Sequence, residues 1–243
     1  MNTLRVVTYN IHKGVQGMGP ARRLEIHNLR QAVSQLDADI VCLQEVRGVN
    51  RKMQRHFSHW PAEGQAQVLA PDGYEAVYRT NAVTRHGEHG NALLSRWPVQ
   101  GHGHQDVSDH RFEQRGLLHV TVQVGGRQVH VVVLHLGLIH ASRERQVQAV
   151  GRFIEREVPA HAPLVVAGDF NDWGVRLHRP MADFGLRTFE DARLPTFPAR
   201  MPLLYLDRIY ARGLALVQAH VPHGPAWARL SDHLPLVAEL ALP

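Results

Sequence analysis

The feature that most constrains this sequence is its succession of short apolar runs rich in β-branched residues. Runs of this length, bounded by turn-forming residues, are typical of strands. Ten of them are spread over the 243 residues. They cover Leu4–Asn10, Ile40–Val46, Tyr74–Tyr78, Ala92–Ser95, Gly116–Val124, Gln128–Leu136, Leu164–Gly168, Leu206–Tyr210, Ala215–His220 and Leu236–Leu240. Between Val124 and Gln128, the pair Gly125-Gly126 predicts a tight hairpin.

Two segments have helical spacing instead. Apolar residues recur at intervals of three and four in each, as expected for one face of a helix. The first segment contains Ile26, Leu29, Val33 and Leu36, and the second contains Val147, Val150, Ile154 and Val158. Ser142 is the expected N-cap of the second helix and Pro159 its stop.

The order of these elements favours one fold class. Strands outnumber helices and come in consecutive groups separated by single helices, which suits two packed sheets flanked by helices better than a doubly wound parallel sheet. No linker, low-complexity tract or short repeat divides the sequence. We therefore predict a single domain over residues 1–243.

Composition places the chain among ordinary globular proteins, with 44% hydrophobic and 20% charged residues. The net charge of +5 favours anionic partners, although the basic residues are scattered. The lone cysteine, Cys42, lies in an apolar run and is expected to be a small buried hydrophobe, which suits a reducing compartment. Because the N-terminus leads directly into a strand and no apolar stretch reaches membrane-spanning length, we predict a cytoplasmic protein.

Polar residues of the kinds that act in catalysis and metal binding lie at the ends of the apolar strands. They occur in TYNIHKG, LQEV, HGNALLS, Arg115-Gly116, HLGL, GDFNDW, LDRIY and SDHLP. Taken singly, each is explained by a turn or a solvated strand end. Together they place two carboxamides, four carboxylates and two histidines at equivalent positions, and desolvating so many polar groups is costly without a cation and an anionic ligand.

The ordered set of these residues resembles the endonuclease/exonuclease/phosphatase superfamily, the DNase I-like group. The set is Asn10, Glu45, Asn91, His135, Asp169 with Asn171, Asp207, and Asp232 with His233. The resemblance extends from about Leu4 to Leu240, and LQEV, GDFND and SDHLP in this order are its most specific part. TYNIHKG, HGNALLS, HLGL and GDFNDW are also similar to a compact bacterial branch that often accompanies cardiolipin synthases.

The resemblance implies a four-layer α/β sandwich, with two mixed sheets face to face and helices outside. The strand-end motifs would then converge on one rim. His135 stands where abasic-site endonucleases of the family carry a tyrosine, which favours the deoxyribonuclease, sphingomyelinase and 5-phosphatase side of the family.

Residue chemistry suggests how such a rim would hydrolyse a phosphodiester. Glu45 with Asn10 offers hard oxygen ligands for Mg²⁺, or for Mn²⁺ in its place. Asp232 is expected to add a second carboxylate or to orient its neighbour.

The remaining roles concern water and phosphate. We expect Asp169 to activate the attacking water and Asn171 to donate to a phosphate oxygen. We expect Asp207 to hold His233 cationic, and His135 to stabilise the transition state or protonate the leaving group. Asn91 and Arg115 are expected to bind phosphate, with a surface ion pair as the alternative for Arg115.

The leading functional hypothesis is a Mg²⁺-dependent phosphodiesterase acting on a phospholipid head group or a small diester. A nuclease acting on DNA or RNA is the alternative enzyme, and a non-catalytic binding module on the same fold is the alternative of another class. No obligate protein partner is evident from the sequence.

Several other segments have simpler interpretations. Gly101–His104 is expected to be a polar loop, and Lys13 and Arg47 are expected to be solvated. The segment Pro202–Leu206 is expected to be a buried strand, with transient contact to a membrane surface as the alternative.

Overall fold

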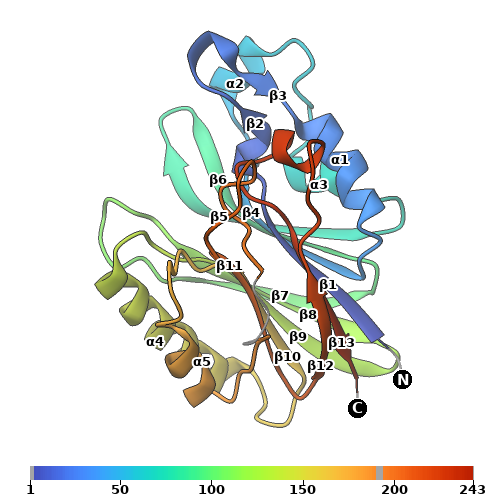
Figure 1. Cartoon of the computed structure of the whole chain (residues 1–243), viewed down its shortest axis with the longest axis vertical. Helices are drawn as coiled ribbons and strands as arrows, with labels where there is room; N and C mark the ends of the chain where they lie inside the picture. Colours follow the sequence, from blue (N-terminus) through green and yellow to red (C-terminus); the bar gives the residue numbers. More distant parts are fainter. Residues whose placement is uncertain (1–2, 190–193, 243) are drawn as a thin grey trace.

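Two β-sheets packed face to face form the centre of the molecule, and helices cover their outer faces (Figure 1). The computed structural model describes residues 3–189 and 194–242. The four layers confirm the predicted α/β sandwich, and the strands of each sheet run in both directions. Within the described residues, no helix has both the length and the apolar character needed to cross a bilayer.

The first sheet has the strand order β12-β13-β1-β4-β6-β5. Its strands are β1 (Thr3–Asn10), β4 (Ile40–Val46), β5 (Glu75–Thr84), β6 (Gly87–Ser95), β12 (Ala215–His220) and β13 (Leu236–Ala241). The central pair β1 and β4 is parallel, so both strands end at the same edge. The other neighbours are antiparallel.

The second sheet has the order β11-β10-β9-β8-β7. Its strands are β7 (Val99–Asp106), β8 (Gly116–Val124), β9 (Arg127–His135), β10 (Leu164–Asp169) and β11 (Asp207–Arg212). Here β9 and β10 are the parallel pair. The predicted hairpin between β8 and β9 is confirmed, because Gly125 and Gly126 both adopt the positive φ that such turns require.

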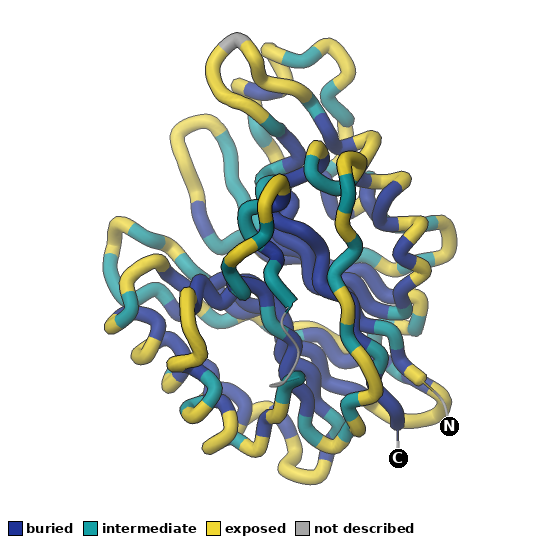
Figure 2. Tube along the Cα trace, viewed as in Figure 1, coloured by how far each residue is buried: buried dark blue, intermediate teal, exposed yellow. Residues whose placement is uncertain are grey.

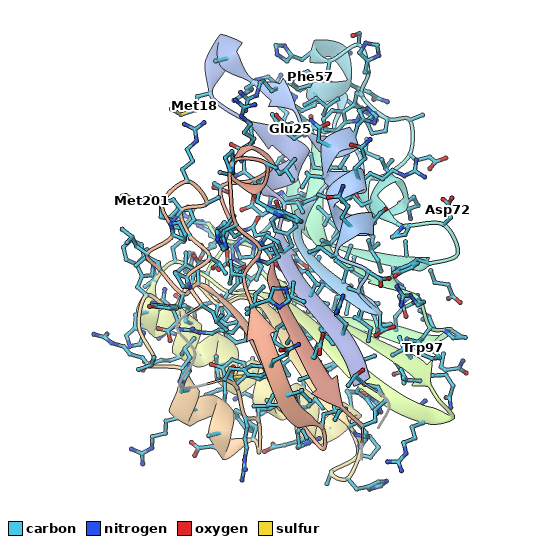
Figure 3. The ribbon with its side chains drawn as sticks, turned by 45° about the vertical axis from the view of Figure 1, so that its right-hand side comes forward. Met18, Glu25, Phe57, Asp72, Trp97 and Met201 are labelled. Carbon is cyan, nitrogen blue, oxygen red and sulfur yellow. The ribbon has the colours of Figure 1, made fainter. Side chains whose placement is uncertain are left out.

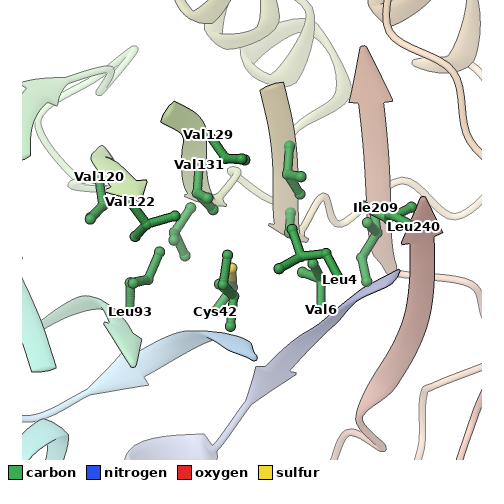
Figure 4. Packing of buried hydrophobic residues seen from close by; sticks show 14 of the residues in the cluster. Leu4, Val6, Cys42, Leu93, Val120, Val122, Val129, Val131, Ile209 and Leu240 are labelled. Atoms are coloured by element: carbon green, nitrogen blue, oxygen red, sulfur yellow. The ribbon is translucent and has the colours of Figure 1, made fainter. Parts of the chain in front are cut away.

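The main core lies between the sheets and follows the two-residue alternation of strands. Val129, Val131 and Val133 of β9 point inward, as do Leu4 and Val6 of β1 (Figure 4). Cys42 belongs to the same cluster and is fully buried, which confirms its interpretation as a small core residue.

Helices bury the outer faces of the sheets against two further clusters. On the first sheet, α1 (Ile26–Gln35) and α3 (Gln65–Leu69) supply this cover; on the second, α4 (His140–Glu157) and α5 (His178–Asp183) do so. In Figure 2 the strands are therefore mostly buried, whereas the exposed segments lie in loops and on outward helix faces. The short helix α2 (Arg51–His56) and the hairpin of β2 (Val15–Gln16) and β3 (Arg23–Leu24) extend beyond the first sheet.

The structure confirms all ten predicted strands but corrects three other predictions of local structure. Gly101–His104 is not a loop: it lies within β7, an edge strand whose mostly exposed side chains lack the apolar alternation that would reveal it. Ser142 is not the N-cap, because α4 begins at His140 after Ile139, and the buried Ser142 hydroxyl donates to Asp109 instead. The helix ends at Glu157, two residues before Pro159, which agrees with the expected stop.

Pro202–Leu206 is not a buried strand either. Leu204 forms only an isolated bridge with Phe197, and Leu203 is 60% exposed. The segment runs as a loop to the start of β11, and of its residues Leu206 is buried.

Candidate active site

The inward positions of the core strands continue to one end of the sandwich, where they become polar. In β9 and β10 the inward series reaches His135 and Asp169, which lie directly opposite each other. Asp207 faces Asp169 from β11. On the first sheet, Asn10 of β1 and Asn91 of β6 follow the same alternation. The strand pattern therefore brings these five predicted residues together.

Asp169 is the centre of the cluster and is 1% exposed. One carboxylate oxygen accepts from the Asn171 backbone N–H at 2.9 Å, and the other from the Asn10 Nδ2 at 3.1 Å. The Nε2 atoms of His135 and His233 lie 3.6 and 3.7 Å from this second oxygen. The carboxylate is thus held by both sheets and faces two imidazoles.

The local backbone conformation sets the direction of the Asp169 carboxylate. Gly168 has a φ of +157°, and a Cβ atom there would collide with the carbonyl oxygen of Leu134 on the neighbouring strand. Asn171 adopts a left-handed φ of +48° that turns the chain sharply after the strand, and its Nδ2 donates to Leu136 at 2.9 Å. The GDFN sequence therefore supplies a close strand approach followed by an abrupt turn.

His233 forms the predicted pair with Asp207. Its Nδ1 lies 2.8 Å from the Asp207 Oδ2, so this ring nitrogen carries the proton and Nε2 faces Asp169. The Thr196 hydroxyl donates to the same Asp207 oxygen at 2.5 Å. Asp207 is fully buried and orients His233 toward the centre of the site.

Glu45 approaches the site through a break in strand pairing. The register between β4 and β6 shifts between Leu43 and Val46, and Glu45 has a φ of +56°. Its carboxylate accepts from the Lys13 Nζ at 2.6 Å. Lys13 is therefore not solvated as expected: it is half-buried as the counter-ion of Glu45.

Asp232 has a similar relation to His12. Its Oδ2 lies 3.1 Å from the His12 Nδ1, and its side chain is 39% exposed. The Ser231 hydroxyl beside it donates to the backbone carbonyl of Asn10 at 2.6 Å. This bond connects the SDHLP segment to the end of β1.

Asn91 and Arg115 have contacts that differ from a simple phosphate clamp. The Asn91 Nδ2 donates to the carbonyls of Gly116 and Val133, so the amide joins the two sheets, and its oxygen is buried without a hydrogen-bond partner among the described residues. The Arg115 guanidinium donates to Glu113 at 3.0 Å and to the Leu136 carbonyl at 3.2 Å. This ion pair is largely buried rather than on the surface.

Arg47 is also not solvated as expected. Its guanidinium lies 5.8 Å from the centre of the Trp60 ring, and burial lowers its pKa to about 10. Arg47 therefore flanks the cluster at the end of β4.

The two histidines have opposite electrostatics. Burial and the nearby Arg115 hold the pKa of His135 well below its usual range, so this imidazole is neutral. Burial also disfavours the His233 cation, but Asp207 and Asp169 outweigh it and raise the pKa of His233 to about 10. Burial raises the pKa of Asp169 above that of an ordinary carboxyl, which makes it a better proton acceptor.

Two sets of residues could hold a cation. The ligand atoms of Asp169, Asp207 and His233 lie within 4.8 Å of one another, but a protonated His233 has no free lone pair for a metal. Glu45 is the better candidate for a cation ligand, because its carboxylate already binds a cationic group, the ammonium of Lys13. Burial opposes its charge, yet the ammonium of Lys13, which donates to this carboxylate, holds the Glu45 pKa below the usual range.

Sequence reasoning missed two residues of this site. Thr196, which bonds Asp207, lies in an LPTFP segment with no catalytic pattern. Ser231 belongs to the quoted SDHLP motif, but the sequence assigned it no role. Only the proximity of Ser231 to Asp232 could have drawn attention to it.

The geometry can be compared with known proteins. The model of the Endonuclease/Exonuclease/phosphatase family matches residues 7–233. The chain is 38% identical over 248 residues to the Uncharacterized protein YbhP of Escherichia coli strain K12, covering 99% of this chain and 97% of that protein.

Solved structures share the fold at lower identity. An endonuclease/exonuclease/phosphatase from Bacteroides vulgatus superposes with a TM-score of 0.77 at 19% identity, covering all of both chains. The human Nocturnin catalytic domain, solved with a bound sulfate anion, superposes with a TM-score of 0.74 at 20% identity, covering 99% of this chain and 94% of that one.

Proposed function

Because the chain belongs to the endonuclease/exonuclease/phosphatase family, we propose that it is a Mg²⁺-dependent phosphodiesterase that hydrolyses a phospholipid head group or a small diester. The family name itself describes enzymes that cleave phosphoesters. The observation that carries the proposal is the convergence of Asp169 with Asn10, His135 and His233 at the end of the inter-sheet core. Mn²⁺ is the alternative ion, and a cytoplasmic location is part of the same proposal.

Asp169 is the proposed general base. It accepts a proton from the attacking water as the water oxygen bonds to phosphorus, and the bond to the leaving oxygen breaks on the opposite side. Asn10 and the Asn171 backbone fix the direction of its carboxylate. Asn171 also has a second amide hydrogen that can donate to a phosphate oxygen.

His233 is the proposed cationic partner of the transition state. Asp207 and Thr196 hold its ring in place, and its protonated Nε2 faces the position where phosphate charge develops. His135 is neutral without substrate, so we propose that it bonds the leaving oxygen or takes up a proton when the anion arrives. Arg115 contributes positive charge near His135, while its donors remain on Glu113 and the backbone.

Glu45, Asn10 and Asp232 are the residues proposed to hold the cation. When bound there, Mg²⁺ would polarise the phosphoryl group and stabilise charge on the leaving oxygen. Lys13 pairs with Glu45 and His12 with Asp232, so these side chains must move aside or share the carboxylates. Asn91 holds the two sheets at this place rather than offering its amide hydrogens to phosphate.

The test is turnover of bis(p-nitrophenyl) phosphate by the full chain with Mg²⁺, with Mn²⁺ and with EDTA. We expect metal-dependent hydrolysis that falls about 1000-fold in Asp169→Asn, because the base is lost. Asp172→Asn is the matched control: Asp172 is a buried carboxylate of the same motif, but it accepts from the Leu177 backbone N–H. Unchanged turnover in Asp169→Asn would refute the assignment of the base.

A substrate panel then separates the alternatives. It covers phospholipids, sphingomyelin, inositol phosphates, plasmid DNA and RNA. A nuclease would prefer the nucleic acids and lose activity steeply with salt, because its affinity depends on phosphate contacts. Absence of metal-dependent turnover on every substrate would favour the binding module.

A further inference from the structure

Exposed apolar side chains are concentrated at the end of the sandwich that carries Asp169, Asp207 and Glu45, which we call the catalytic end. Eleven large hydrophobic residues of the described chain are exposed. Ten lie in loops or hairpin ends that follow or precede the catalytic ends of the strands: Met18, Val49, Val83, Phe112, Leu138, Ile139, Trp173, Val175, Met201 and Leu203. The remaining one, Val217, lies in the edge strand β12. Single exposed hydrophobes are ordinary, but their gathering around one site indicates an interaction surface.

Two of these exposed residues lie in segments that are far apart in the sequence. Met18 is 86% exposed in the β2–β3 hairpin, and Met201 is 64% exposed in the loop before β11. Figure 3 shows both on the same side of the molecule, away from Asp72 and Trp97. Segments distant in sequence thus present flexible apolar side chains in one direction.

Basic residues accompany them without acidic neighbours in sequence. Segments 11–24, 173–179, 198–205 and 221–230 contain no Asp or Glu. They contain seven basic residues: Lys13, Arg22, Arg23, Arg176, Arg179, Arg200 and Arg229. Across the described part of the chain, Arg22, Arg200 and Arg229 are exposed and have no ion-pair partner.

A groove connects this surface to the candidate active site. It has a volume of 460 Å³, and Gly17, Arg23 and Arg200 line it together with Asp232. A second groove of 640 Å³ shares Arg200 and adds Arg229. Met18 and Met201 directly follow lining residues, so they lie at the edge of the path that leads to Asp232.

From this arrangement we infer that the catalytic end is a docking surface for an anionic phospholipid interface. The inference rests on the proposed function, because it explains how a diester in a head group would reach the groove. Apolar tips gain free energy by entering the acyl boundary, and arginines at the same level attract anionic head groups. A nucleic acid would satisfy the arginines, but its phosphates offer nothing to Met18, Met201 or Leu203.

The opposite end shows that this composition is specific to the catalytic end. There, Arg96 pairs with Asp37 and Asp39, and Arg5 pairs with Glu239. Arg127 at that end is exposed, but none of the exposed large hydrophobic residues of the described chain lies in the β8–β9 turn beside it. The combination of exposed arginines with exposed apolar side chains is therefore a feature of the catalytic end, and an anionic lipid interface complements it.

The test is sedimentation of the full chain with phosphatidylcholine vesicles, with and without phosphatidylglycerol. We expect binding to the anionic vesicles, weakened about tenfold or more in a Met18→Ser, Met201→Ser, Leu203→Ser triple variant, because the apolar tips are lost. An Arg22→Gln, Arg200→Gln, Arg229→Gln variant should lose the preference for phosphatidylglycerol. Circular dichroism and thermal unfolding confirm that the variants are folded.

Two control variants have matched chemistry elsewhere. Val217→Ser removes an exposed apolar side chain from β12, and Arg127→Gln removes an exposed arginine from the β8–β9 turn. Both should bind as the wild type does. Equal effects of control and test variants, no sedimentation of the wild type with either vesicle, or tighter binding to duplex DNA than to vesicles would each overturn the inference. Vesicle binding requires no turnover, so its failure is distinct from failure of the soluble diester assay.

Discussion

The catalytic end of the sandwich and the opposite end use the same strands but different backbone conformations. Within residues 3–189 and 194–242, five non-glycine residues have a positive φ. Four of them, His12, Lys13, Glu45 and Asn171, lie at the catalytic end, and only Asp37 lies at the other. Because such conformations are costly for residues with a Cβ atom, they persist where the surrounding structure holds them in place. The catalytic end thus accepts local strain to direct its side chains.

The two ends also balance charge differently. At the opposite end, carboxylates such as Asp39 and Glu239 accept from guanidinium groups. At the catalytic end, Asp169 faces Asp207 across paired strands, with His233 between them. At the opposite end, ion pairs neutralise these carboxylates. At the catalytic end, the buried carboxylates and the histidine remain available to bind a cation and an anion. Substitutions at the opposite end should therefore mainly affect stability, and substitutions at the catalytic end should mainly affect turnover.

Among the substitutions that compare the two ends, the largest expected effect is on turnover, in Asp207→Asn. The substitution removes the charge that keeps His233 protonated, so burial should lower the His233 pKa from about 10 toward or below its ordinary value. We expect diester turnover at neutral pH to fall about 100-fold or more. Turnover against pH, with NMR titration of the His233 ring, measures both changes.

The matched control is Asp39→Asn at the opposite end, where the carboxylate accepts from the Arg5 backbone and from Arg96. That variant should lose stability and keep its turnover per folded molecule. A His233 pKa that remains near 10 in Asp207→Asn would contradict this account of the site.

A core substitution at the opposite end should have the reverse effect. Leu240 is fully buried between the sheets and pairs with Leu4. Leu240→Ala leaves a cavity, so we expect the free energy of unfolding to fall by about 3 kcal/mol. Denaturant titration measures the loss, and turnover corrected for the folded fraction should be unchanged. A parallel loss of turnover would show that the two ends are not independent.

The smallest expected effect is on the pH dependence of folding stability, to which two histidines should contribute in opposite directions. His119 stacks on His130 beneath α4, and burial with the neighbouring ring lowers the His119 pKa to about 4. The unfolded chain takes up this proton near pH 6.5, so the neutral folded form loses about 2 kcal/mol of stability as pH falls from 6.5 to 4. Stability measured against pH should show this slope, and His119→Gln should reduce it.

His233 has the opposite sign. Its pKa is raised to about 10, so its contribution to stability is complete below pH 6.5 and is lost between pH 6.5 and 10. His233→Gln should therefore flatten the alkaline limb and leave the acid limb intact. If both histidine variants changed the same limb, the electrostatic contrast between the two regions would be wrong.

Strand alternation explains how much could be predicted from the sequence. Apolar runs predict strands, and a two-residue period continued to their ends places Asp169 and His135 on the inner face of one sheet and Asn10 on the inner face of the other. The same logic failed for β7, because an exposed edge strand such as Val99–Asp106 has no buried face to produce a pattern. The helices α2, α3 and α5 are too short to show helical periodicity.

Contacts between segments distant in sequence could not be predicted. Thr196 reaches Asp207 through a loop, and Lys13 reaches Glu45 only after the left-handed turn at His12 and Lys13. Such contacts depend on loop paths that local patterns do not record. Pro202–Leu206 shows the same limit, because an apolar run can form either a core strand or a partly buried loop with the same composition.

The hydrogen bond from Asn10 to Asp169 joins residues 159 positions apart, one from each sheet. Neither sheet alone contains a complete catalytic centre, since the proposed base and the amide that aligns it come from opposite halves of the sandwich. The proposed enzymatic activity therefore requires that the two sheets have packed together correctly, and measuring it reports that packing. During refolding it should emerge only with the final stacking step, after secondary structure has formed, and sliding of one sheet against the other by a single residue would silence it.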